Sequence, residues 1–213
     1  MVCRGWEEAE AWDAAVASVA GDSAVEAAAA GVEVVADSAA VARRGAGDMN
    51  IARILRHLFT TMWSARRAFP RTALDAIEKA IQESEQNHCG QIRFVVEHSL
   101  DLPDLLHGVT AKDRAVEMFA RLHLWDTEHN NGVLIYLLLA DRDVEILADR
   151  GVHAHVGSQG WETICRAMED AFRAGDFHGG ILRGIRAAGE HLDRHYPTDG
   201  PAKNELPDRP VIL

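Results

Sequence analysis

The sequence has few cysteines and no long hydrophobic run. Its three cysteines, Cys3, Cys89 and Cys165, stand far apart and form no C-x-x-C pair. An odd number of isolated cysteines fits neither a disulfide framework nor a cysteine zinc site, and it favours a reducing, cytoplasmic location. The longest strongly apolar run, Val133–Ala140, is far shorter than the roughly 20 residues of a membrane helix. Residues 1–8 lack the charged start and apolar stretch of a secretory signal. We therefore expect a soluble, intracellular chain.

Acidic residues outnumber basic residues. The 213 residues include 33 acidic and 22 basic side chains, which gives a formal net charge of −11. The sequence therefore does not predict binding of nucleic acid through a general positive field, and we expect no nucleic-acid partner. Metal cations or basic partners suit this balance better, although an acidic surface also serves solubility.

The familiar catalytic fingerprints are absent. The sequence contains no G-x-S-x-G elbow, no G-x-x-x-x-G-K-[ST] phosphate loop and no H-E-x-x-H zinc motif. Cys165 falls on the apolar face of an expected helix, where a small core residue is the favoured interpretation. His191 and His195 are four residues apart on an expected helix, but no third ligand is evident. No catalytic centre follows from these residues.

The first 48 residues differ from the rest. They include sixteen alanines, nine acidic and three basic residues, with no sustained amphipathic period. Such a segment has helix propensity but little to pack with. Two interpretations stay open: a dispensable extension before a natural start at Met49, or a loosely helical arm.

Residues 49–71 predict a basic amphipathic helix. Apolar residues recur there at helical spacing, and Arg53, Arg56, His57 and Arg67 mark the other face. The segment holds five arginines and no acidic residue. Such a helix can lie on an anionic membrane surface, but packing on its own domain or on a partner is the more frequent outcome.

The remaining pattern predicts an α/β fold over residues 72–196. We expect a small mixed β-sheet sandwiched between helices, with the helix at 49–71 as an N-terminal addition. Thr110 and Asp113 have capping-box spacing and open one of the helices. The expected order is a helix at 72–88, a strand at 91–97, a helix from 110, strands at 132–140 and 144–148, two more helices, and an extended Pro-rich tail at 197–213.

A polar loop precedes the strand at 132–140. Asp126, Glu128 and Asn130 alternate just before Gly132, and hard cations such as calcium prefer such oxygen ligands. An EF-hand is excluded, because the glycine comes one place late and Leu137 occupies the twelfth position. A looser oxygen site remains.

Topology predicts that a second loop meets the first. If the two strands form a hairpin that turns at Asp141–Asp143, then Asp126, Glu128 and Asn131 lie beside Asp149, Arg150 and the segment 151–155. Sites are often built where polar groups converge at one end of a sheet. The competing interpretation is a pair of polar loops whose side chains form turns and caps. We read Asp141–Asp143, at the opposite end, as turn formers.

The same residues carry a resemblance to a known family. The run W-D-x-x-x-N-N-G-V-L-I-Y-L-L-L-A-D-R-x-V-E-I-x-A-D-R-G, from Trp125 to Gly151, resembles the signature of the TPM-domain family. That family includes a chloroplast thylakoid-lumen acid phosphatase. The segment Phe172–Phe177 supports the resemblance, which spans roughly 72–195.

The resemblance implies an α/β sandwich, a divalent-cation site that binds calcium in some members, and weak phosphatase activity in a few. Carried over by position, it implies metal ligation by Asp126, Glu128, Asn131 and Asp149. The family's usual G-x-G after the second strand is here Gly151-Val152-His153. The secondary metal candidates are His129, His153 and His155.

Two functions follow as expectations. The first is a cation-binding interaction module that works with a membrane-anchored protein of the same family. The second is a metal-dependent phosphatase for small phosphomonoesters, in which Asp126 and Asp149 hold the metal and Arg150 neutralises phosphate charge. We favour the first, because a phosphatase should show several carboxylates fixed close together or a nucleophile with its base.

Overall fold

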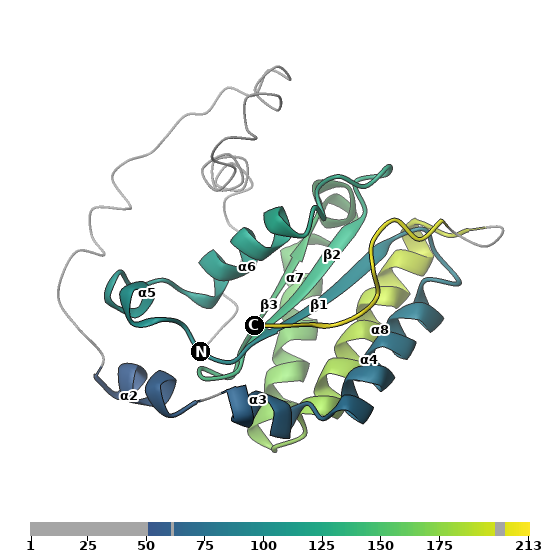
Figure 1. The fold of residues 1–213 in the computed structure, drawn as a ribbon. Coiled ribbons are helices and arrows are strands. Elements are labelled where there is room, and N and C mark those ends of the chain that lie inside the picture. Colours follow the sequence, from purple (N-terminus) through teal and green to yellow (C-terminus); the bar gives the residue numbers. More distant parts are fainter. Residues whose placement is uncertain (1–50, 61, 199–202) are drawn as a thin grey trace, which may run out of the picture.

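The computed structural model describes residues 51–60, 62–198 and 203–213 (Figure 1). The expectations for residues 1–48, including a start at Met49, lie outside the described residues. In chain order the elements are α2 (Ile51–Phe59), α3 (Met62–Ala68), α4 (Arg71–Ser84), β1 (Gln91–Glu97), α5 (Leu102–Leu106), α6 (Ala111–Arg121), β2 (Gly132–Leu138), β3 (Asp143–Ala148), α7 (Arg150–Arg173), α8 (Phe177–His195) and β4 (Val211–Ile212).

The strands form one mixed sheet in the order β3-β2-β1-β4. β1 runs parallel to β2, with Phe94 opposite Ile135, and also parallel to β4. β2 and β3 form the antiparallel hairpin, in which Tyr136 lies opposite Glu145. The predicted small mixed sheet is confirmed.

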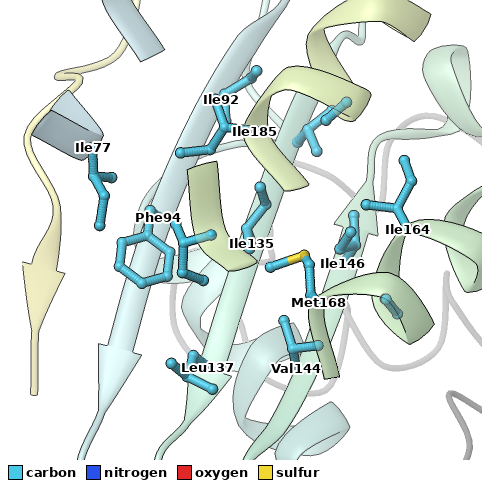
Figure 2. Close-up of a cluster of buried hydrophobic side chains, with 14 of the residues drawn as sticks. Ile77, Ile92, Phe94, Ile135, Leu137, Val144, Ile146, Ile164, Met168 and Ile185 are labelled. Atoms are coloured by element: carbon cyan, nitrogen blue, oxygen red, sulfur yellow. The ribbon is translucent and has the colours of Figure 1, made fainter. Parts of the chain in front are cut away.

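Helices cover both faces of this sheet. α4, α7 and α8 lie on one face, and α6 packs on β2 and β3 from the other (Figure 1). Successive side chains of a strand point to opposite faces. Phe94 and Ile135 therefore enter the core under α7 and α8 (Figure 2), whereas Val95 and Tyr136 enter the core under α6. The sandwich of a sheet between helices is confirmed.

Several boundaries differ from the sequence expectation. The single helix expected at 49–71 is two helices, α2 and α3, and the hydroxyl of Thr60 donates to the carbonyl of Arg56 where α2 ends. The helix expected at 72–88 ends at Ser84, because the Glu85 carboxylate accepts from the backbone N–H of Ile92. α7 starts at once after β3, since Asp149 accepts from the N–H of Arg150 as its N-cap. The tail is not only extended: it contributes β4 to the sheet edge.

The turn residue Asp141 has a second role, which the sequence did not predict. Arg53 Nε donates to Asp141 Oδ2 at 2.9 Å. Arg56 Nη2 and His57 Nε2 lie 3.0 and 3.2 Å from the carboxylate, without hydrogen-bond alignment. His57 Nδ1 accepts from the N–H of Leu100 at 2.9 Å, so the ring is neutral. Burial lowers the pKa of His57, in agreement with a neutral ring. Asp141 thus attaches α2 to the domain through the polar face of the helix.

Replacing Asp141 with alanine should release α2. The variant loses the charge-assisted hydrogen bond from Arg53 Nε and the carboxylate beside Arg56 and His57, whereas Arg53 Nη2 keeps the carbonyl of Val109, a loss of about 1.5–3 kcal/mol. We expect amide hydrogen exchange of residues 51–59 to rise at least about tenfold while the sheet keeps its protection. Asp143→Ala, in the same turn, is the matched control and should leave exchange unchanged. Unchanged protection of α2 in Asp141→Ala would show that this contact does not hold the helix.

Candidate functional site

The two predicted loops do meet at one end of the hairpin. The backbone N–H of Asp149 donates to the carbonyl of Gly132 at 2.8 Å, so the ladder continues to the last residue before α7. Asn130 has φ 51°, a left-handed conformation that asparagine tolerates better than most residues. A Cβ atom on Gly151 would lie 2.5 Å from the carbonyl oxygen of Asn130 and 3.2 Å from that of His129. The loop backbone therefore rests directly on the first turn of α7.

Asn131 and Asp149 form the buried part of this site, with exposed fractions of 0% and 4%. The Asn131 amide donates through Nδ2 to the carbonyl of Cys89 at 2.9 Å, and Asp149 Oδ1 accepts from the N–H of Arg150 at 2.7 Å. The other oxygens, Asn131 Oδ1 and Asp149 Oδ2, are buried with no hydrogen-bond partner in the described part of the chain. Burial raises the pKa of Asp149, and the hydrogen bond from Arg150 opposes that shift.

Cys89 and Tyr196 complete the site, and neither was a candidate from the sequence. A Cβ atom on Gly151 would lie 2.7 Å from the Tyr196 hydroxyl. Burial raises the pKa of Tyr196, with further contributions from the neighbouring Asp149 and Cys89. Both residues come from segments remote from the predicted loops, at the start of β1 and the end of α8. We call Cys89, Asn131, Asp149, Gly151 and Tyr196 the loop-end cluster.

Asp126 and Glu128 do not join Asp149 in a metal-ligating group. Both are exposed, and the described residues contain no group of three or more His, Cys, Asp or Glu that could hold a metal ion. The expected convergence of these three carboxylates is therefore wrong. The N–H of Glu128 instead donates to Glu205 of the C-terminal tail at 3.2 Å. The backbone N–H of Arg150 donates to Asp149, and its exposed side chain acts on that carboxylate through its charge, which opposes the raised pKa of Asp149.

The histidine candidates are dispersed. His129 is exposed, and burial lowers the pKa of His153. His155 stacks on His195 at a ring-centroid distance of 4.7 Å and meets the ring of Tyr196 edge-on at 6.0 Å. His153 and His155 lie on α7 and not in a loop, because Asp149 starts that helix early. The alternative pairing of His191 with His195 gains no third ligand among the described residues.

The loop-end cluster contains oxygen atoms of the kind that hard cations prefer. One carboxylate oxygen and one amide oxygen have no hydrogen-bond partner among the described residues, and the backbone carbonyls of His129 and Asn130 lie against Gly151. Of the predicted ligands, Asn131 and Asp149 are thus the two that are buried and keep such an oxygen.

Gly151→Ala should destabilise the protein by about 1–3 kcal/mol, because the added methyl group would overlap the loop backbone and the Tyr196 hydroxyl. Urea denaturation measures the change. The control is Gly160→Ala, which lies beyond the break in α7 at Gly157 (φ 69°, ψ 168°) and whose new methyl group would meet only side chains, chiefly Val156 Cγ1 at 2.6 Å. Val156 must move to admit the methyl group, which offsets the gain from replacing a helical glycine, so we expect a change below about 1 kcal/mol. Equal stability of the two variants would contradict this packing.

Comparison with known proteins decides the family. A family model described as the TPM domain matches residues 66–191, more than half of the chain. The chain belongs to the TPM-domain family. No curated protein matches the sequence.

Solved structures similar to this chain include two determined by NMR. The NMR structure of the BA42 protein from the psychrophilic bacterium Bizionia argentinensis is 30% identical, with a TM-score of 0.60, over 67% of this chain and 93% of that chain. The N-terminal domain of a protein from P. gingivalis is 18% identical, with a TM-score of 0.46, over 58% of this chain and 78% of that chain. Within its described residues, this TPM-domain protein has no helix that is both long and apolar enough to cross a bilayer.

Proposed function

We propose that this TPM-domain protein is a divalent-cation-binding interaction module, with calcium as the best-suited ion. The observation that carries the proposal is the pair of unpartnered buried oxygens, Asn131 Oδ1 and Asp149 Oδ2. Leaving a buried polar group without a partner costs about 1–3 kcal/mol, and more when the group is charged. A bound cation removes that cost at both oxygens.

The ion would join two segments that otherwise meet only through backbone contacts. Asn131 belongs to the loop before β2, and Asp149 is the N-cap of α7. The backbone carbonyls of His129 and Asn130, which face Gly151, are available as further ligands. Cation binding would therefore fix the shape of the loop that carries the exposed residues Trp125, Asp126 and Glu128.

That exposed loop is the surface we assign to a membrane-associated partner. Trp125 has an exposed fraction of 46%, which is high for a large aromatic side chain, and the two carboxylates beside it are exposed. An aromatic anchor with a polar rim is the usual composition of an interaction surface. The cation would set the affinity for the partner by ordering this loop.

A phosphatase receives less support from the geometry. The candidates Asp126 and Arg150 are exposed, and the hydrogen bond between Arg150 and Asp149 comes from the backbone N–H, while the charge of Arg150 favours the ionised carboxylate. A hydrolase needs a nucleophile within hydrogen-bond reach of a base, or several carboxylates fixed together. We therefore do not propose a phosphatase, and the experiment below distinguishes one from a cation-binding module.

The test is thermal unfolding of the full chain in EDTA, and then in excess Ca²⁺, Mg²⁺, Mn²⁺ or Zn²⁺. A ligand at a hundredfold excess over its Kd stabilises the folded state by about 2.7 kcal/mol, which raises the midpoint by several degrees. We expect the largest rise with Ca²⁺. No shift with any ion contradicts the proposal, and a shift with Zn²⁺ alone replaces it by a site of histidine or cysteine ligands. Hydrolysis of a generic phosphate ester, abolished by EDTA and by Asp149→Asn, would favour the phosphatase instead.

A further inference from the structure

α2 presents its apolar stripe to solvent and its polar face to the domain. Arg53 and His57 point inward to Asp141, and only Ile54 of the larger apolar residues packs partly on the core. Amphipathic helices of globular domains normally have the reverse orientation. The outward side chains stand at helical spacing, and their exposed fractions are 64% for Ile51, 46% for Leu55, 60% for Leu58 and 79% for Phe59.

The neighbouring elements α3 and α5 carry further exposed apolar side chains. Trp63 of α3 is 69% exposed, and Leu102 and Leu106 of α5 are 49% and 56% exposed. The segment that carries α5 is bonded to α2 at both ends, through Leu100 N–H to His57 Nδ1 and through Arg53 Nη2 to the carbonyl of Val109 (Figure 1). Of the eight large hydrophobic side chains exposed in the described structure, seven lie here. We call these seven side chains the α2–α5 surface.

The charge around this surface is positive, in a protein of net charge −11. Residues 51–71 contain five arginines and no acidic residue, whereas α5 contributes only Asp104 and its N-cap Asp101. Arg67 lies over the ring of Trp63 at 5.6 Å from the centroid. Arg66 and Arg71 take part in none of the ion pairs of the described residues, and they line one pocket together with Asp75 and Glu78 of α4. A contiguous exposed apolar patch with cations at its border marks a binding surface.

We propose that the α2–α5 surface seats the protein on an anionic lipid bilayer. The leucines, Phe59 and Trp63 would enter the boundary between headgroups and acyl chains, and the arginines would contact lipid phosphates, as interfacial amphipathic helices do. The Asp141 contact keeps the polar face of α2 on the domain, so the apolar stripe is held outward before the membrane is met. This proposal is independent of the cation site.

The charge pattern favours lipid over a second copy of the chain. A two-fold interface built on this surface would bring the arginines of one copy against those of the other, and like charges repel. An anionic bilayer supplies the opposite charge over the whole surface. Salt screens such contacts, with a Debye length of about 10 Å at 0.1 M.

The experiment is co-sedimentation of the full chain with vesicles of phosphatidylcholine alone, or with 30% phosphatidylglycerol added, a fraction chosen as about that of an anionic membrane leaflet. We expect binding to the anionic vesicles to be at least about tenfold stronger and to weaken with salt. Trp63→Ser and the double variant Arg66→Glu/Arg67→Glu should each lower it by about tenfold or more. The matched control, Arg186→Glu/Arg194→Glu, changes two exposed arginines of α8 and should bind as wild type.

Three outcomes overturn the proposal. The first is absent or equal binding to the two kinds of vesicle. The second is an equal loss in the control, which would indicate a general charge effect. The third is a concentration-dependent dimer in sedimentation equilibrium that Trp63→Ser abolishes, which would assign the surface to a second copy. All variants are first compared by thermal unfolding, and because they change exposed residues, we expect wild-type midpoints.

Discussion

Arg114→Ala should lower the free energy of unfolding by about 3–5 kcal/mol, the loss expected when one partner of a buried ion pair is removed. Arg114 on α6 donates to Glu97 of β1 through Nε at 3.1 Å and Nη2 at 2.8 Å. The Tyr136 hydroxyl of β2 donates to the same carboxylate at 2.6 Å. Only 9% of the Glu97 side chain is exposed. Truncating Arg114 therefore leaves a carboxylate buried beneath α6 with its counter-ion gone.

Urea denaturation measures this loss. The matched control is Arg121→Ala on the same helix, whose side chain is 64% exposed and pairs with Glu117. Exposed pairs contribute little, so we expect a change below about 1 kcal/mol. The double variant Glu97→Gln/Arg114→Met removes both charges and should recover part of the stability. Equal effects of Arg114→Ala and Arg121→Ala would contradict the structural role of this network.

Asp149→Asn should make the metal-free protein more stable at neutral pH, by up to about 2 kcal/mol. Asparagine keeps an oxygen to accept from the N–H of Arg150, so the N-cap of α7 persists. It also removes a buried negative charge whose Oδ2 has no hydrogen-bond partner among the described residues. A residue that costs stability in the metal-free protein is expected where a cation belongs.

The pH dependence of the stability difference shows whether the Asp149 charge causes the gain in Asp149→Asn. Because the pKa of Asp149 is raised above its ordinary value of 3.8, the folded protein binds this proton more tightly than the unfolded chain. The contribution of Asp149 to the free energy of unfolding is therefore most favourable below pH 3.8, and it is lost as the pH rises through the raised pKa. The advantage of Asp149→Asn should grow over the same interval and then stay constant. Subtracting the free energy of unfolding of wild type from that of the variant at each pH cancels the contributions of the histidines, because both proteins share them.

Thermal unfolding in EDTA over a pH series gives these values, with Asp126→Asn as the control. Asp126 is exposed, so its replacement should shift stability by less than about 0.5 kcal/mol at every pH. A metal-free Asp149→Asn protein that is less stable than wild type at neutral pH would show that the carboxylate is satisfied without an ion.

The sequence predicted the elements whose signals are local. The apolar run of β2 and the hairpin to β3 follow from residue type and turn chemistry, and the Thr110 capping box is present as expected. The meeting of the two loops also follows from the hairpin alone. The position of the loop at 126–131 beside the start of α7 was therefore predictable before any coordinates.

The features of the fold and of the loop-end cluster that the sequence did not predict depend on contacts between distant segments. Cys89 and Tyr196 reach the loop-end cluster because Cys89 N–H donates to the carbonyl of Tyr196 at 3.0 Å, and no local pattern encodes that bond. Asp126 and Glu128 have the same local spacing whether they face the site or the solvent. The inward polar face of α2 likewise depends on Asp141, a residue far away in the chain.

Calorimetric titration of Ca²⁺ into the metal-free full chain tests the central claim most directly, when wild type is compared with Asp149→Asn and Asp126→Asn. The account predicts that wild type and Asp126→Asn bind one ion with similar affinity. Asp149→Asn, which loses a charged ligand, should bind at least about tenfold more weakly. Equal binding by all three proteins, or loss of binding in Asp126→Asn alone, would contradict a site formed by Asn131 and Asp149.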